Sequence, residues 1–171
     1  MLADVTIRPA SLSDLPRLTD IHNFYVVSTH ITFDVHPYTP QQRRPWFDEH
    51  NDGRRYRIFV AEDRQTGVVG YAATGPFRSK VGYDTTVEAS VYCGPNAVGK
   101  GIGTRLYTAL FDVLAKEDIN RIVAGIAQPN PASNALHERF GFKPVGTFSA
   151  AGRKFGKYWD VLWMERALVA G

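Results

Sequence analysis

A glycine-rich segment, residues 94–103, constrains the fold of this chain more than any other stretch. Before it, apolar residues alternate with others over residues 85–93, which predicts a strand with one buried face. After it, apolar residues recur at helical spacing over residues 103–116. A strand, a glycine loop and a helix in this order leave free backbone amides at the start of the helix, where an anion can bind.

The other periodicities predict a sheet with helices packed on it. Apolar or alternating runs indicate further strands at residues 5–9, 57–63, 68–77, 121–128, 145–148 and 157–164. Further helices are indicated after an N-cap at Ser11 or Ser13, from Thr39-Pro40 onward, and at residues 133–140 before Gly141. The expected fold class is α+β, with a central mixed sheet of about seven strands and about four helices.

Composition limits the class of protein. The 171 residues, 44% of them apolar, suffice for one domain with a single core. The charges, Lys+Arg 20 against Asp+Glu 17, are dispersed, so we expect no nucleic-acid partner. Cys93 is the only cysteine, which excludes an intrachain disulfide or a thiolate metal cluster and indicates a reducing compartment. Because no apolar run approaches the roughly 20 residues that span a bilayer, we expect a cytoplasmic protein with no membrane partner.

Several kinds of phosphate site compete for the glycine segment. Residues 94–101 nearly match G-x-x-x-x-G-K-[ST], but Gly101 stands where a hydroxyl would hold magnesium. The dinucleotide fingerprint also fails, because the next strand ends in Gln128-Pro129 without an acidic residue. A pyrophosphate held by the amides of residues 99–104 and by Lys100 remains possible. The glycines alone are more typical of a plain tight turn.

Two motifs in order resolve this choice by resemblance. G-K-G-I-G at residues 99–103, with N-P-A-S-N-A-L-H-E-R-F-G-F at residues 130–142, resembles the acyl-coenzyme A site of the GNAT superfamily of N-acetyltransferases. Further motifs resemble its phosphinothricin N-acetyltransferase group, among them T-F-D (32–34), R-x-x-W-F (43–47), G-P-F-R (75–78), T-V-E-A-S-V-Y (86–92) and G-R-K-F-G-K-Y-W-D-V (152–161). The chain departs from the superfamily at Val98, where Gln or Arg is common, and we expect this to weaken affinity without changing the ligand.

The resemblance implies one acetyl-CoA-dependent domain over residues 1–171, with a mostly antiparallel sheet, no metal and a homodimeric assembly. The fourth strand should splay from the fifth and expose its backbone to the pantetheine arm. An amide near Tyr92 could polarise the thioester carbonyl. The expected cofactor-binding residues are Val91, Tyr92, Cys93, Gly99, Lys100, Gly101, Ile102, Gly103, Thr104 and Asn130. Asn130 is also a good N-cap for the helix that follows it.

Acetyl transfer to an amine needs a base and a proton donor. Glu88 matches the family's base, and its apolar neighbours along the strand should raise its pKa. His137 stands where the superfamily commonly has tyrosine, so it is expected to protonate the departing thiolate or to act in a relay with Glu88. A satisfied structural histidine is the alternative, and Tyr92 is a second candidate acid.

An acceptor pocket is expected where Phe33, Tyr92 and the loop with Arg78, Lys80 and Tyr83 converge. Arginine suits an amino acid with an α-carboxylate and a second tetrahedral group, such as phosphinothricin, methionine sulfoximine or methionine sulfone. The alternatives are a different small amine or amino acid, a protein acceptor, or a module that binds acetyl-CoA without catalysis. The last has no need of Glu88, so this carboxylate favours an enzyme.

Overall fold

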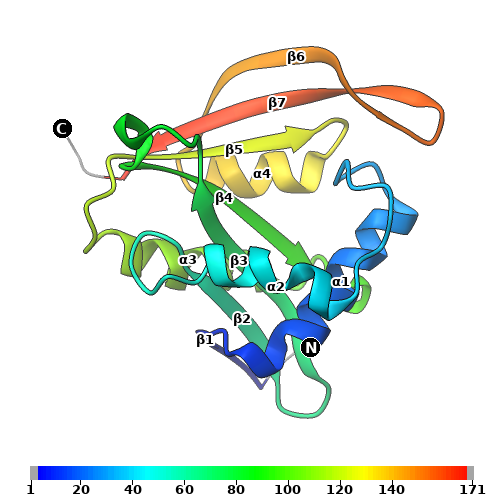
Figure 1. Cartoon of the computed structure of the whole chain (residues 1–171), viewed down its shortest axis with the longest axis vertical. Coiled ribbons are helices and arrows are strands. Elements are labelled where there is room, and N and C mark those ends of the chain that lie inside the picture. The colour runs from blue at the N-terminus through cyan, green and yellow to red at the C-terminus, as the bar shows by residue number, and fades with distance from the viewer. Residues whose placement is uncertain (1–3, 169–171) are drawn as a thin grey trace.

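The computed structural model describes residues 4–168 as a seven-stranded mixed sheet in the order β1-β2-β3-β4-β5-β7-β6 (Figure 1). Only β4 and β5 pair in parallel, so the predicted mixed, mostly antiparallel sheet is confirmed. The strands are β1 (Val5–Pro9), β2 (Ile58–Asp63), β3 (Gly67–Pro76), β4 (Thr86–Cys93), β5 (Arg121–Ala127), β6 (Lys143–Lys154) and β7 (Lys157–Ala167). The helices are α1 (Leu15–Ser28), α2 (Pro40–Glu49), α3 (Ile102–Leu114) and α4 (Pro131–Arg139).

Local side-chain chemistry explains where the first two helices begin. The Thr39 hydroxyl accepts from the Gln42 amide (3.2 Å) and the Gln42 side chain accepts from the Thr39 amide (2.8 Å), which starts α2 as predicted. The start of α1 differs from the prediction, because a short 3-10 turn follows Ser11 and α1 begins only after Asp14. Asp14 accepts from the Ser11 amide (2.8 Å) and pairs with Arg8, so its carboxylate is drawn into this turn.

Helices cover both faces of the sheet (Figure 1). The apolar side of α3 packs with α4 against one face, and α1 and α2 pack against the other. Strand β4 alternates as expected, with Val87 and Ala89 in the α3 core and Tyr92 in the α1–α2 core. Glu88 therefore points to the α1–α2 side. No helix among residues 4–168 is long and apolar enough to cross a membrane.

The terminal hairpin is longer than the sequence pattern predicted. Strands β6 and β7 run to the two-residue turn Phe155-Gly156, where both residues have positive φ (53° and 69°). Most of β6 is exposed, so it lacks the apolar alternation that identifies a strand. The far end of the hairpin is held because Lys154 Nζ donates to the Thr32 carbonyl (2.7 Å) and the Phe33 ring packs on Gly152.

This packing predicts that Gly152→Ala destabilises the protein. A methyl group at this position would collide with the Phe33 ring, and overpacking of this kind costs about 1–3 kcal/mol. Gly146→Ala in the same strand is the matched control, since a Cβ there meets nothing within 4 Å. Urea denaturation of both variants measures the difference. Equal stability of the two variants would show that the hairpin is not held against Phe33.

Candidate functional site

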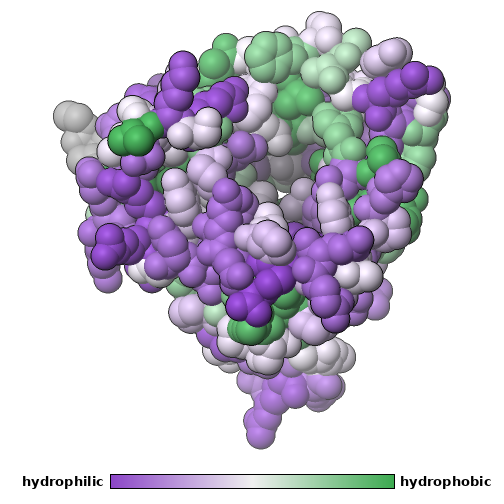
Figure 2. All heavy atoms as spheres, viewed as in Figure 1, coloured by the Kyte–Doolittle hydropathy of each residue, from purple (hydrophilic) through white to green (hydrophobic). Residues whose placement is uncertain are grey.

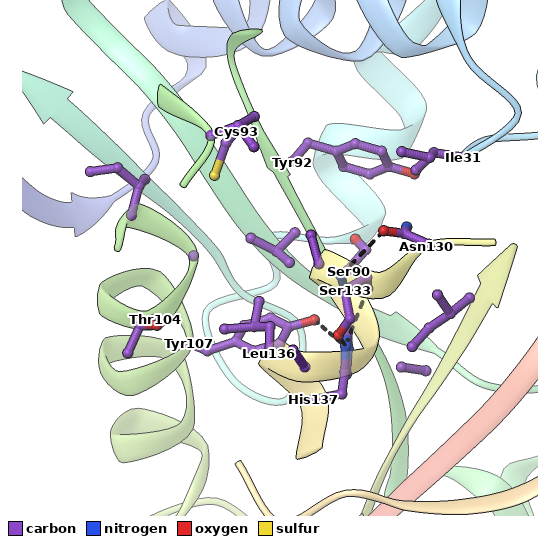
Figure 3. Close-up of a pocket in the computed structure, with 18 of the residues that line it drawn as sticks. Ile31, Ser90, Tyr92, Cys93, Thr104, Tyr107, Asn130, Ser133, Leu136 and His137 are labelled. Atoms are coloured by element: carbon purple, nitrogen blue, oxygen red, sulfur yellow. Dashed lines mark hydrogen bonds between the residues drawn. The ribbon is translucent and has the colours of Figure 1, made fainter. Parts of the chain in front are cut away.

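The parallel contact between β4 and β5 is short and ends in an open groove. Its last pair joins Glu88 to Val123, and beyond it the strands diverge as expected. A cavity of about 440 Å³ fills the gap, bounded by residues 89–93 of β4, the glycine loop, the end of β5, and α4 (Figure 3). Backbone of β4 therefore faces a space that an extended ligand can enter.

The glycine loop lies at one end of this groove. Gly99 and Gly101 have left-handed φ values of 75° and 77°, and a Cβ at either would meet nothing within 4 Å, so backbone conformation rather than crowding requires glycine. The first hydrogen bond of α3 is donated by Arg105 to the Gly101 carbonyl (3.1 Å). The amides of residues 102–104 precede it and have no acceptor within the helix, although the Gly103 amide points to the Cys93 thiol. These amides and the exposed Lys100 fit a pyrophosphate.

Gly103 has a different role from the other two glycines. A Cβ there would lie 3.1 Å from Leu136 and 3.9 Å from Val91, so glycine lets α3, α4 and β4 approach closely. On β4, the Cys93 carbonyl already accepts the Tyr25 hydroxyl (2.6 Å), and burial raises the pKa of the Cys93 thiol to about 11. Cys93 thus lines the groove as a neutral thiol at pH 7.

Two residues from α4 and its start also line the groove. The Asn130 side chain accepts from the Ser133 amide (3.2 Å), which confirms the predicted N-cap. His137 Nδ1 donates to the Ser133 carbonyl (2.8 Å), so Nε2 carries the lone pair that accepts the Tyr107 hydroxyl (3.0 Å) (Figure 3). Burial lowers the pKa of His137 and raises that of Tyr107. The pair is therefore neutral at pH 7.

Glu88 lies at the opposite side of β4 from His137, on the α1–α2 face. No hydrogen bond or ion pair to its carboxylate is present among the described residues, so a direct link to His137 is not formed. Burial raises the pKa of Glu88 above its ordinary value of 4.5, and the positive charge of Arg78 partly opposes the rise. A carboxylate in this state can accept a proton near neutral pH.

A second cavity of about 500 Å³ lies near Glu88, although Glu88 is not part of its lining. The lining includes Thr86, two residues before Glu88 on β4, and Val123, which pairs with Glu88 on β5, together with Arg78, Tyr83 and Trp163. In the space-filling view the molecule is hollowed between α2 and the terminal hairpin, with hydrophobic residues gathered above the hollow (Figure 2). Glu88 thus lies in sequence between Thr86, which lines this partly apolar pocket, and Ala89, which lines the groove.

Comparison with known protein families identifies the family to which the chain belongs. Residues 7–163 match the family described as the acetyltransferase (GNAT) domain. The chain is a GNAT acetyltransferase. Its four helices and seven-stranded sheet with a splayed β4 are the expected fold.

Individual relatives narrow the group. A phosphinothricin N-acetyltransferase from Streptomyces coelicolor is 53% identical over 167 residues, 97% of this chain and 98% of its own. An L-methionine sulfoximine/L-methionine sulfone acetyltransferase from Pseudomonas aeruginosa is 36% identical over 94% of this chain and 92% of its own. A GNAT superfamily phosphinothricin acetyltransferase from Sinorhizobium meliloti, solved in complex with acetyl-CoA, has a TM-score of 0.90 at 32% identity, covering 95% of this chain and 88% of that one. This GNAT protein is an acetyl-CoA-dependent N-acetyltransferase of the phosphinothricin group.

The residues that the sequence analysis expected to converge in one acceptor pocket lie in different parts of the structure. Arg78 and Tyr83 line the second cavity, whereas Tyr92 lines the groove and packs on Tyr25 (5.2 Å between ring centroids). Phe33 packs on the terminal hairpin, and Lys80 is exposed outside both linings. The reason is distance, since Tyr83 lies in the turn before β4 and Tyr92 near the end of β4, a strand that rises about 3.3 Å per residue.

Sequence reasoning missed Tyr107, the hydrogen-bond partner of His137. In the helical pattern its ring is indistinguishable from a core aromatic, and it is fully buried. The signal available in the sequence is a hydroxyl within an apolar stripe, because a buried phenol needs a partner.

The glycine loop predicts a selective loss of acetyl-CoA binding in Gly101→Ala. A left-handed alanine costs roughly 1–2 kcal/mol, and relaxation of this strain would turn the amides away from the groove. Loss of one charge-assisted hydrogen bond would lower the affinity about tenfold or more. Gly67→Ala is the matched control, with the same φ of 77° in the remote β2–β3 turn. Calorimetric titration should find weakened binding only in Gly101→Ala; equal affinity in both variants would contradict the loop's role.

Proposed function

We propose that the chain transfers the acetyl group of acetyl-CoA to the α-amine of a small amino-acid-like acceptor with a second tetrahedral oxygenated group, of the phosphinothricin, methionine sulfoximine or methionine sulfone type. The names of the relatives that are 53% and 36% identical support this acceptor class. The observation that carries the proposal is the position of Glu88. It occupies the last paired position of β4, one residue before the part of the strand that lines the groove and opposite Val123, which lines the second cavity, so a base there would lie close to both.

The groove is the proposed place for acetyl-CoA. The amides of residues 102–104, with Lys100, would hold its pyrophosphate, and Asn130 and the backbone of residues 91–93 would hold the pantetheine arm. Bound acetyl-CoA supplies the activated acetyl group. An amide near Tyr92 would donate to the thioester oxygen, where negative charge develops.

Glu88 is the proposed general base. Its partly buried carboxylate without an ion-pair partner is a stronger proton acceptor than a solvated one, because burial raises its pKa. It would take a proton from the acceptor nitrogen directly or through a water. We further propose that the leaving sulfur takes its proton from the hydrogen-bonded pair of His137 and Tyr107.

The second cavity is the proposed acceptor pocket. The Arg78 guanidinium stacks on the Phe77 ring (4.2 Å to the centroid), which holds its planar fork near Glu88 for a carboxylate or a tetrahedral oxyanion. Tyr83 would add a hydroxyl, and Lys80 a mobile cation at the rim. Phe33 and Tyr92 are not part of the lining of this cavity and lie outside the proposed pocket. A homodimer and a cytoplasmic location remain predictions.

Glu88→Gln should abolish most of the activity while leaving acetyl-CoA bound. Loss of a general base lowers kcat/KM by about 10²–10⁴-fold. Because the pKa of Glu88 is raised, wild-type kcat/KM should fall as the pH drops through a value above 4.5, and this limb should be absent in the variant. Thiol release across pH measures both. Glu138→Gln, an exposed glutamate on α4, is the control; wild-type kinetics in Glu88→Gln would contradict the proposed base.

The acceptor class is tested by thiol release with phosphinothricin, methionine sulfoximine, methionine sulfone, methionine, polyamines and a lysine peptide. Turnover should be confined to the first three. Arg78→Lys should raise the acceptor KM about tenfold or more, because the bidentate contact is lost. Turnover of a different amine would overturn the proposed acceptor class but leave the acetyltransferase activity in place. Binding of acetyl-CoA without turnover of any amine would favour a non-catalytic module.

A further inference from the structure

His50 lies at the end of α2 and is held in one orientation. Its Nδ1 lies 2.9 Å from the Trp46 carbonyl, and its ring stacks on the Trp46 ring at 5.1 Å between centroids. Because a carbonyl only accepts, Nδ1 carries the hydrogen and Nε2 carries the free lone pair. Within residues 4–168, Nε2 has no hydrogen-bond partner.

The free edge of this ring lies over Gly75. A Cβ at Gly75 would collide with Nε2 and Cδ2 of His50 and lie 3.1 Å from Cε1. Gly75 is paired with Glu88 across the antiparallel β3–β4 ladder. Directly opposite residues project to the same face, with Cβ atoms about 4.5–5.5 Å apart. The imidazole therefore occupies the place of the side chain next to Glu88.

The charges around this ring leave it free to accept a proton. On its own helix, the Glu49 carboxylate lies 3.6 Å from Nδ1 and Arg43 acts with the opposite sign. On the neighbouring strand β4, Glu88 projects to the same face as the ring, and Glu88 in turn lies in the field of the positive charge of Arg78. Burial lowers the pKa of His50 below 6.5 and raises that of Glu88 above 4.5, so the two proton affinities converge. The His50 side chain is 19% exposed, which leaves it a path to solvent.

Amide formation releases a proton that Glu88 alone cannot dispose of. An ammonium acceptor loses two protons from nitrogen when it becomes an amide, while the leaving sulfur takes up one. The other must leave the site before Glu88 can act again.

We propose that His50 is the outlet for this proton: Nε2 takes it from Glu88 across a water and passes it to solvent. The acceptor N–H bond breaks with its electron pair left on nitrogen, and the proton binds a Glu88 oxygen. That O–H bond then breaks as an N–H bond forms at Nε2, and the imidazolium loses the proton to bulk water. His50 is thus a positioning and relay residue, and its role rests on Glu88 as the proposed base.

Two variants separate relay from packing. His50→Phe keeps an aromatic ring on Trp46 but has no nitrogen, and His50→Ala leaves room for added imidazole. Both should lower kcat at pH 7 about tenfold, less than the loss of the base itself, with acetyl-CoA affinity unchanged. Added imidazole should restore the kcat of His50→Ala, and the recovery should be proportional to the concentration of neutral imidazole. His36→Phe, at an exposed histidine, is the control.

A readout independent of turnover tests the juxtaposition. In nitrogen-15 spectra of histidine-labelled protein, His50 should show the Nδ1–H tautomer, and its titration midpoint should fall in Glu88→Gln because a neighbouring negative charge is removed. An unchanged midpoint would overturn the contact. Wild-type kcat in both His50 variants, or a loss that imidazole does not restore, would overturn the relay. If Glu88→Gln itself retains full activity, the proposed base fails, and the relay with it.

Discussion

The early end of the β4–β5 pairing is the constraint on which the rest of the structure depends. Once Glu88 and Val123 have paired, the edge of β4 faces the groove instead of a strand. Buried backbone groups need partners, so an edge of this kind is stable only beside water or a ligand. Strand β4 remains straight because β3 pairs with it from Gly70–Cys93 to Pro76–Val87. The edge of β4 that faces the groove is thus unpaired, while the other edge of the same strand is held by β3.

The same gap brings the two faces of the sheet together. On one side lie α3, α4 and the His137–Tyr107 pair, and on the other lie Glu88, the second cavity and α2. In a continuous sheet these groups would be separated by hydrogen-bonded backbone. Here the pairing ends at Glu88, so beyond it no hydrogen-bonded backbone of β5 separates the two faces.

The features that could be predicted from the sequence are those that depend on residues close together in the chain. The left-handed glycines, the Thr39 cap and the alternation of β4 all follow from residues close together in the chain. The length of β6 was underestimated because both of its faces are largely exposed and leave no apolar period. The partner of His137 and the separation of Arg78 from Tyr92 depend on contacts distant in sequence, which composition and spacing do not encode.

One physical cause sets the chemistry of the site. Burial moves the pKa of a carboxyl group and that of an imidazole in opposite directions: it raises the pKa of Glu88 and lowers the pKa values of His50 and His137. Each shift favours the neutral form, so the strands carry little fixed charge where the substrates meet. The pKa values of Glu88 and His50 are thereby brought closer together. A strong ion pair at Glu88 would lower the pKa of its carboxyl group, whereas the Arg78 guanidinium stacks on the Phe77 ring.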